Sequence, residues 1–183
     1  MAAAHALAQG WVERVLIVDC DVHQGDGTAR LFANEPGVFT FSMHAARNFP
    51  ARKPKSDLDI ALAAHTDSET YLDALKDALA SIDQQFSPEL VIYLAGADPY
   101  IDDRYGHLAL DKDGLLRRDQ CVLSWCHQRG FPVAIDDVDG LEVQFVGVER
   151  DALGALGIEH RFALLEPELA VLRPLRCCKV LEY

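Results

Sequence analysis

One short segment constrains the fold more than any other: the apolar residues 15–18 run directly into Asp19, Asp21 and His23. Such a run predicts a buried strand. Side chains alternate faces along an extended chain, so these polar side chains, at i, i+2 and i+4, can share one face. Buried carboxylates need a positive partner, and a metal ion suits two carboxylates and an imidazole together. Gly25-Asp26-Gly27 then predicts a turn beside this site.

A structural alternative also exists for an isolated Asp-x-His, because acidic residues after a strand often cap the next helix. A second segment favours the metal site: the apolar residues 90–94 are followed by Ala95-Gly96-Ala97-Asp98. Ligands collect at the carboxyl ends of parallel strands, so we expect Asp98 beside Asp21 and His23. Two carboxylate oxygens and an imidazole nitrogen are a ligand set for Zn²⁺ that leaves one position open to water.

Strand-like and helix-like segments alternate along most of the chain. The strands are expected at 12–18, 38–42, 58–62, 90–95 and 131–135. Helical spacing of apolar residues predicts one helix that begins at a capping box, 66–69, and ends before Ser87-Pro88. A second helix is expected over 114–128, begun by Asp111 or Asp113 and closed by Gly130. This alternation predicts an α/β fold, an open parallel sheet with helices on both faces.

Composition excludes several classes of protein. The 183 residues, half of them hydrophobic, can support one core and hence a single domain. A net charge of −12 argues against direct nucleic-acid binding, which needs a basic surface. The apolar runs are too short to span a membrane, and the N-terminus lacks the features of a signal peptide. Five cysteines without a Cys-x-x-Cys pair are typical of a reducing compartment, so a cytoplasmic protein is expected.

The order of the motifs resembles the histone deacetylase family, in particular its class IV-like and bacterial acetoin-utilisation-type members. The likeness covers about Val12 to Ile135. It is carried by Asp19-Cys20-Asp21-Val22-His23-Gln24-Gly25-Asp26-Gly27-Thr28-Ala29, Phe41-Ser42-Met43-His44, Ser56-Asp57-Leu58-Asp59-Ile60 and Ala95-Gly96-Ala97-Asp98. This resemblance implies the arginase/deacetylase fold.

The resemblance also implies roles for individual residues. Asp21, His23 and Asp98 occupy the positions of the family's three zinc ligands. Asp19 and Asp26 occupy those of two carboxylates that orient a pair of catalytic histidines.

A potassium ion is implied as well, surrounded by side-chain or backbone oxygens at four positions: Asp19, Asp21, His23 and Ser42. The family reaction is hydrolysis of an acetyl-lysine amide, in which zinc polarises the carbonyl and the water, a histidine acts as general base and a tyrosine stabilises the oxyanion. An acetylated lysine peptide or a small acetylated amine is therefore the expected substrate.

Two family features are missing from this sequence. It contains no His-His pair, and after Pro132-Val133-Ala134-Ile135 the family's Gly-rich turn and oxyanion tyrosine are replaced by Asp136-Asp137-Val138-Asp139-Gly140, with no tyrosine until Tyr183. Family members are typically longer, so we expect an N-terminal portion to be absent. The chain is therefore expected to bind zinc as a deacetylase-family hydrolase with little or no activity, or to be a non-catalytic metal-binding or interaction remnant of that fold.

The divergent tail, 136–183, starts abruptly and suggests a reading-frame change or a deletion junction, which the other frames of the coding DNA would reveal. A strand is expected at 143–148 and a short helix at 163–172. The basic, proline-rich segment 48–56 predicts either a solvated loop or a rim that meets the substrate. A nucleotide or phosphate site at Gly25-Asp26-Gly27 is a third possibility, disfavoured because the sequence has no P-loop or dinucleotide fingerprint.

Overall fold

The structure, a computed structural model, describes residues 2–136 and the strand 143–146. The elements follow one another along the chain as α1 (Ala2–Ala8), β1 (Val15–Asp19), α2 (Asp26–Leu31), β2 (Val38–Ala45), β3 (Leu58–Leu62), α3 (Ser68–Gln85), β4 (Leu90–Leu94), α4 (Lys112–Arg129), β5 (Val133–Asp136) and β6 (Val143–Val146).

The strands form one sheet with the order β3-β2-β1-β4-β5-β6. Strands β1 to β5 are parallel to their neighbours, and β6 is antiparallel to β5. Strand β1 lies in the middle, with its last residue, Asp19, opposite Ser42 of β2 and Leu94 of β4. The expected open parallel sheet is confirmed, and the ends of β1 and β4 lie side by side at one edge.

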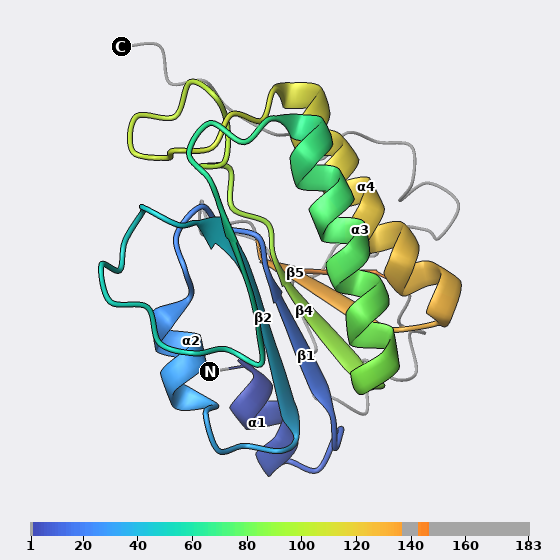
Figure 1. The fold of residues 1–183 in the computed structure, drawn as a ribbon. Coiled ribbons are helices and arrows are strands. Elements are labelled where there is room, and N and C mark those ends of the chain that lie inside the picture. The colour runs from blue at the N-terminus through green and yellow to red at the C-terminus, as the bar shows by residue number, and fades with distance from the viewer. Residues whose placement is uncertain (1, 137–142, 147–183) are drawn as a thin grey trace.

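Helices cover both faces of this sheet, as the alternating pattern predicts (Figure 1). The long helices α3 and α4 pack on one face, and the short helices α1 and α2 lie on the other. Residues of β1 alternate between the two: Leu16 and Val18 belong to the larger core, and Val15 and Ile17 belong to the smaller one. Strand periodicity therefore builds two cores of unequal size around one sheet.

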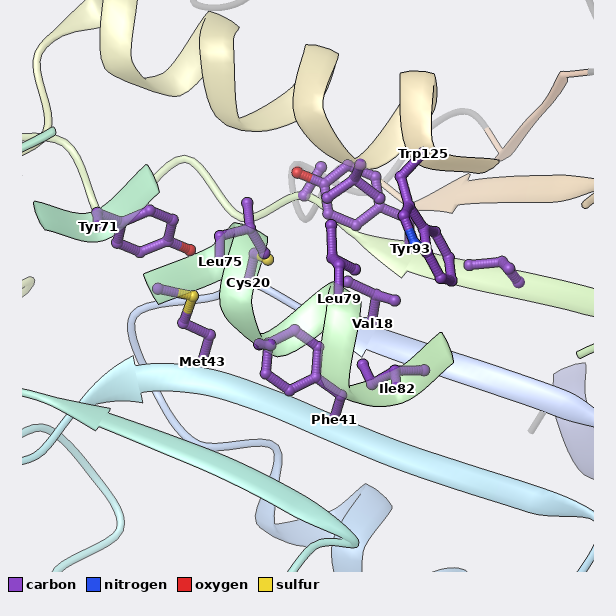
Figure 2. Packing of buried hydrophobic residues seen from close by; sticks show 14 of the residues in the cluster. Val18, Cys20, Phe41, Met43, Tyr71, Leu75, Leu79, Ile82, Tyr93 and Trp125 are labelled. Atoms are coloured by element: carbon purple, nitrogen blue, oxygen red, sulfur yellow. The ribbon is translucent and has the colours of Figure 1, made fainter. Parts of the chain in front are cut away.

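The larger core lies between the sheet and α3 (Figure 2). Leu75, Leu79 and Ile82 of α3 are almost completely buried against Val18 and Phe41 of the sheet. Full burial of one such side chain contributes about 1.5–3 kcal/mol. This packing, rather than local propensity, holds α3 on the face next to the candidate site.

The ends of the long helices follow from side-chain and backbone caps. Asp67 is the N-cap of α3 and accepts a hydrogen bond from the Thr70 N–H at 2.9 Å. The expected capping box is wrong, because Glu69 turns away to pair with Arg117 of α4. At α4 the expectation is confirmed: Asp111 is the N-cap, and the helix ends at a left-handed residue, Gly130, with φ 68°.

Other boundaries differ from expectation by a few residues. Strand β1 begins at 15 rather than 12, because its partners β2 and β4 start opposite that residue. Strand β2 extends to 45, where its last residues pair with β3. The short helices α1 and α2 were not expected from the sequence, and the segment expected to be a turn contributes the first residues of α2.

The strand expected at 143–148 is present as β6 over 143–146. Residues 147–148 and the expected helix at 163–172 lie outside the described residues. None of the helices in the described part of the chain combines the length and the apolar run needed to cross a bilayer.

Candidate metal centre

Three side chains converge where β1 and β4 end. Asp21 and His23 lie in the bend after β1, and Asp98 lies in the loop after β4. One potential ligand atom from each of them lies within 4.8 Å of the other two. The Nδ1 atom of His23 is 3.0 Å from Asp21 Oδ1 and 2.9 Å from Asp98 Oδ2. The structure therefore brings together the three residues that the sequence proposes as ligands.

Backbone contacts hold the two ligand-bearing loops against each other. The Val22 N–H donates to Asp98 Oδ1 at 2.8 Å, and the His23 N–H donates to Asp21 Oδ1 at 2.7 Å. Gly96 lies between the loops, where an added Cβ would be 2.9 Å from Asp21 Oδ2 and 3.1 Å from Asp98 Oδ1. A larger residue at this position would push the two carboxylates aside.

The donor set fits a small divalent cation. Ligands about 2.0–2.2 Å from a tetrahedral Zn²⁺ lie about 3.3–3.6 Å from one another, so the two nitrogen–oxygen pairs, at 3.0 and 2.9 Å, need to move apart by only a few tenths of an ångström. Two carboxylates facing one imidazole also carry more negative charge than a single ring proton can offset. The side chains of His23, Asp21 and Asp98 keep 35%, 20% and 22% of their surface exposed, so solvent reaches the cluster.

Asp19 lies beside this cluster but does not belong to it. Strand β1 ends at Asp19, so the alternation that would align Asp19 with Asp21 and His23 stops there. The Asp19 carboxylate turns to accept the Asp21 N–H at 3.1 Å. Burial raises the pKa of Asp19 to about 7 and the pKa of Asp98 to about 6. Both shifts show that the protein around these carboxylates disfavours their negative charge.

Asp26 is the first residue of α2, away from the three ligand atoms. Its carboxylate pairs with Arg30 one turn later, at 3.3 Å. The residue before it, Gly25, is the N-cap, and no side chain caps this helix. The structural alternative, in which these acidic residues cap the next helix, is therefore not found. The Asp19 carboxylate lies against Gly25. A negative group at this position also disfavours a phosphate at this turn.

Ser42 is buried on β2, next to Asp19 in the sheet. Its hydroxyl lies 3.0 Å from His44 Nδ1. His44 is itself buried, and burial lowers its pKa, so it is neutral at pH 7.

Two loops meet at Asn48, next to His23, and we call them the loop wall: one contains Asn48 and the other contains Tyr105 and His107. Asn48 donates to the Tyr105 carbonyl at 2.8 Å, accepts the His107 N–H at 3.1 Å and places Nδ2 3.4 Å from His23 Nε2. Lys53 folds back onto the carbonyls of Asn48 and Pro50. The basic segment 48–56 is therefore an ordered loop that contacts residues around the site, and it is not merely a solvated connection.

Sequence reasoning gave no structural role to a buried group beneath the cluster. Arg118 of α4 is 2% exposed and hydrogen-bonds backbone carbonyls at the ends of β1 and β4. A signal was available in the sequence: Arg118 and Asp119 interrupt the apolar stripe that Leu115 and Val122 form along α4. A charged pair on the buried stripe of a helix points to a specific partner.

Comparison with known proteins gives this geometry a context. A family profile described as "Histone deacetylase domain" matches residues 1–135, nearly three quarters of the chain. The chain belongs to the histone deacetylase family. The match ends at β5, where the likeness of the motifs also stops.

Relatives within and near this family agree. An uncharacterized protein of Picosynechococcus sp. is 50% identical over 126 residues, which cover 69% of this chain and 42% of the relative. Histone deacetylase 2 of Arabidopsis thaliana is 31% identical, over 68% of this chain and 33% of its own length. The crystal structure of acetylpolyamine aminohydrolase from Burkholderia pseudomallei shares the fold, with a TM-score of 0.63 at 22% identity, over 74% of this chain and 42% of that one. The chain thus spans less than half the length of these proteins.

Proposed function

We propose that this chain carries the metal-binding half of a zinc-dependent, deacetylase-type amide hydrolase. The observation that supports the proposal is the convergence of Asp21, His23 and Asp98 at the ends of two neighbouring strands, in a chain of the histone deacetylase family. A Zn²⁺ ion held there would supply a Lewis acid for an amide carbonyl and for water. The chain's own part is to hold three ligand atoms in place and to leave one side of the cluster open.

Removal of one ligand tests this assignment. Asp98→Ala should abolish stoichiometric zinc binding, because two remaining ligands make a poor tetrahedral site. Asp102→Ala is the matched control, since Asp102 is an exposed aspartate of the same loop. Zinc content after dialysis against the metal, measured by atomic emission, should be one per chain in the control and near zero in Asp98→Ala. Full occupancy in Asp98→Ala would refute the assignment.

We infer that the substrate is an acetylated lysine peptide or a small acetylated amine such as an acetylpolyamine. The inference is supported by the names of two similar proteins, a histone deacetylase and an acetylpolyamine aminohydrolase. Both substrates present the same reacting group, an N-acetyl amide formed from a primary amine. Isothermal titration of each compound into the zinc-loaded chain would show which one binds at the site.

The polypeptide of 183 residues is expected to hydrolyse such substrates slowly or not at all, even with zinc bound. Its sequence has no His-His pair and no tyrosine between Ile135 and Tyr183. Positioned proton transfer contributes about 10²–10⁴ in rate, and one oxyanion donor contributes about 10²–10³. Zinc uptake without turnover would favour the alternative, a non-catalytic metal-binding remnant. Rapid turnover that His23→Ala abolishes would overturn the expectation and assign the base to another histidine.

A potassium ion next to the zinc is a further part of this proposal. Asp19 and Ser42 are both buried and paired in register on neighbouring strands, which would give such an ion two adjacent oxygen ligands. The melting temperature should then rise more in potassium chloride than in choline chloride of equal ionic strength. Ser42→Ala should remove this difference, and the exposed Ser87→Ala should keep it. Equal melting temperatures of the wild type in the two salts would count against the ion.

A further inference from the structure

Arg118 reaches from α4 to the ends of two strands. Its Nη1 donates to the carbonyl oxygens of Gly96, at 2.7 Å, and Cys20, at 3.3 Å. Its Nη2 donates to the Ala95 carbonyl oxygen at 3.2 Å. One guanidinium therefore bonds to backbone atoms that follow β1 and β4, which are neighbouring strands in the sheet.

The charge of Arg118 is compensated by Asp119, its neighbour in the sequence. Asp119 Oδ1 lies 2.9 Å from Arg118 Nε and 2.8 Å from Nη2, and it accepts the Tyr93 hydroxyl at 2.6 Å. Tyr93 comes from β4, in the larger core (Figure 2). The aspartate and the tyrosine thus set the orientation of the guanidinium, which strengthens the carbonyl contacts in a site from which water is excluded.

The carbonyls held by Arg118 are close in sequence to two of the proposed metal ligands. Cys20 directly precedes Asp21, and Gly96 lies two residues before Asp98. The same two segments are joined again by the Val22 N–H and Asp98 Oδ1. The two ligand-bearing loops are therefore linked twice. Arg118 links them where they begin, and the Val22 N–H and Asp98 Oδ1 link them at the ligands.

Stability alone is a weak explanation for this arrangement. Replacement of a buried ion pair by apolar residues is often neutral or stabilising, and α4 already packs through Leu115 and Val122. Only arginine offers five donors in a planar fork, which can bond several carbonyls at fixed separations. The geometry suits a residue that sets the distance between two loops.

We propose that Arg118 is a positioning residue that sets the separation of Asp21 and Asp98 and thereby the metal affinity of the site. This inference rests on the proposed zinc site. Arg118 touches neither the ligand atoms nor a substrate, so it acts through the backbone of residues 20 and 95–96.

The test is the zinc affinity of Arg118→Lys in the full chain, measured by competition with a chromophoric chelator. Lysine keeps the charge but not the fork, so the zinc dissociation constant should rise about 10–100-fold, as for other groups that orient ligands. The visible spectrum of the Co²⁺-substituted protein should change with it, because the ligand geometry changes. Arg117→Lys is the matched control: Arg117 is the adjacent arginine, pairs with Glu69 at the surface, and should leave both readouts unchanged.

A second comparison separates positioning from general loss of stability. Val38→Ala shortens a buried side chain of the smaller core, opposite the start of β1 rather than its end, and should lower the denaturation midpoint without changing zinc affinity. Arg118→Lys with wild-type zinc affinity and an unchanged cobalt spectrum would overturn the proposal. If that variant does not fold, Tyr93→Phe decides, because it frees Asp119 and should weaken zinc binding in the same direction; unchanged affinity there would also overturn it.

Failure of the underlying metal site gives a different result. The proposed function and this inference would be refuted together if the wild-type chain bound no zinc, or if Asp98→Ala bound zinc with the same affinity as the wild type. Wild-type binding that Asp98→Ala abolishes and Arg118→Lys leaves intact would refute only the positioning role.

Discussion

The inner and outer sides of the ligand cluster are built from different kinds of contact. The inner side is the Arg118 group with the strand ends it holds, and its atoms are almost completely buried. The outer side is the loop wall around Asn48, where residues such as Phe49 and Tyr105 are exposed and the hydrogen bonds are partly buried. Rigid strands and a core helix support the inner side, whereas loops alone support the outer side.

This difference suggests a division of tasks. Metal affinity depends on fixed ligand distances, which the inner side can hold because strands and packed helices move little. Entry of a substrate requires an open face, and loops are where binding residues usually lie. Changes on the inner side should therefore alter zinc affinity most, and changes on the outer side should mainly alter local stability.

The largest effect is expected at Gly96, on the inner side. Gly96→Ala places a methyl group 2.9 Å from Asp21 Oδ2 and 3.0 Å from Asp21 Cα, so the ligands must separate. The zinc dissociation constant should rise on the order of a hundredfold, measured by chelator competition. Gly27→Ala is the control, because its Cβ meets nothing within 4 Å and alanine favours the helix that contains it. Equal zinc affinities of the two variants would contradict the division of tasks between the inner and outer sides.

A smaller loss of affinity should separate two carboxylates that are close in sequence. Asp19→Asn changes a buried group that accepts the N–H of a ligand residue, so zinc should bind about tenfold more weakly. Asp26→Asn changes a residue that pairs with Arg30 across one helical turn and is not among the three proposed ligands, so affinity should stay near that of the wild type. Isothermal titration with zinc would compare them. A larger loss of zinc affinity in Asp26→Asn than in Asp19→Asn would show that the inner side is assigned to the wrong residues.

On the outer side, Asn48→Ala should mainly affect stability. It leaves the His107 N–H and the Tyr105 carbonyl without their partner, at a cost of about 1–3 kcal/mol in the free energy of unfolding. Zinc affinity should change less than in Gly96→Ala, because the contact of Asn48 with the cluster is the long one between Nδ2 and His23 Nε2, at 3.4 Å. Urea denaturation gives the first quantity, and the exposed Asn34→Ala is the control. If Asn48→Ala weakened zinc binding more than Gly96→Ala, the outer side would be the one that sets affinity.

The smallest effect concerns cysteine reactivity. Cys20 and Cys126 are almost fully buried, and burial raises the pKa of each thiol to about 12, so neither should react while the chain is folded. Of the three cysteines in residues 2–136, Cys121 is the half-buried one and should react first with a maleimide, as read by peptide mass mapping. Arg118→Lys should speed the labelling of Cys20 more than that of Cys126, because Arg118 holds the Cys20 carbonyl. Equal acceleration at both would indicate general loosening instead.

The sequence by itself determined much of this protein. Periodicity predicted α3, α4 and the parallel strands, because an apolar stripe or an alternating run has to be buried against something. Asp21, His23 and Asp98 could be selected as partners, because the carboxyl ends of parallel strands meet at one edge of the sheet. Their roles as zinc ligands stay a prediction, as does the single-domain organisation.

The tertiary structure decided what depends on contacts between distant segments. It ended β1 at Asp19, so that carboxylate turned from the expected row to its neighbour's N–H. It moved Glu69 from a helix cap to Arg117, because α3 and α4 pack side by side. Above all, it placed Arg118 nearly a hundred residues along the chain from the carbonyl of Cys20 that it binds. No local pattern specifies such a contact, because its partners are backbone atoms whose position exists only once the sheet and α4 have packed together.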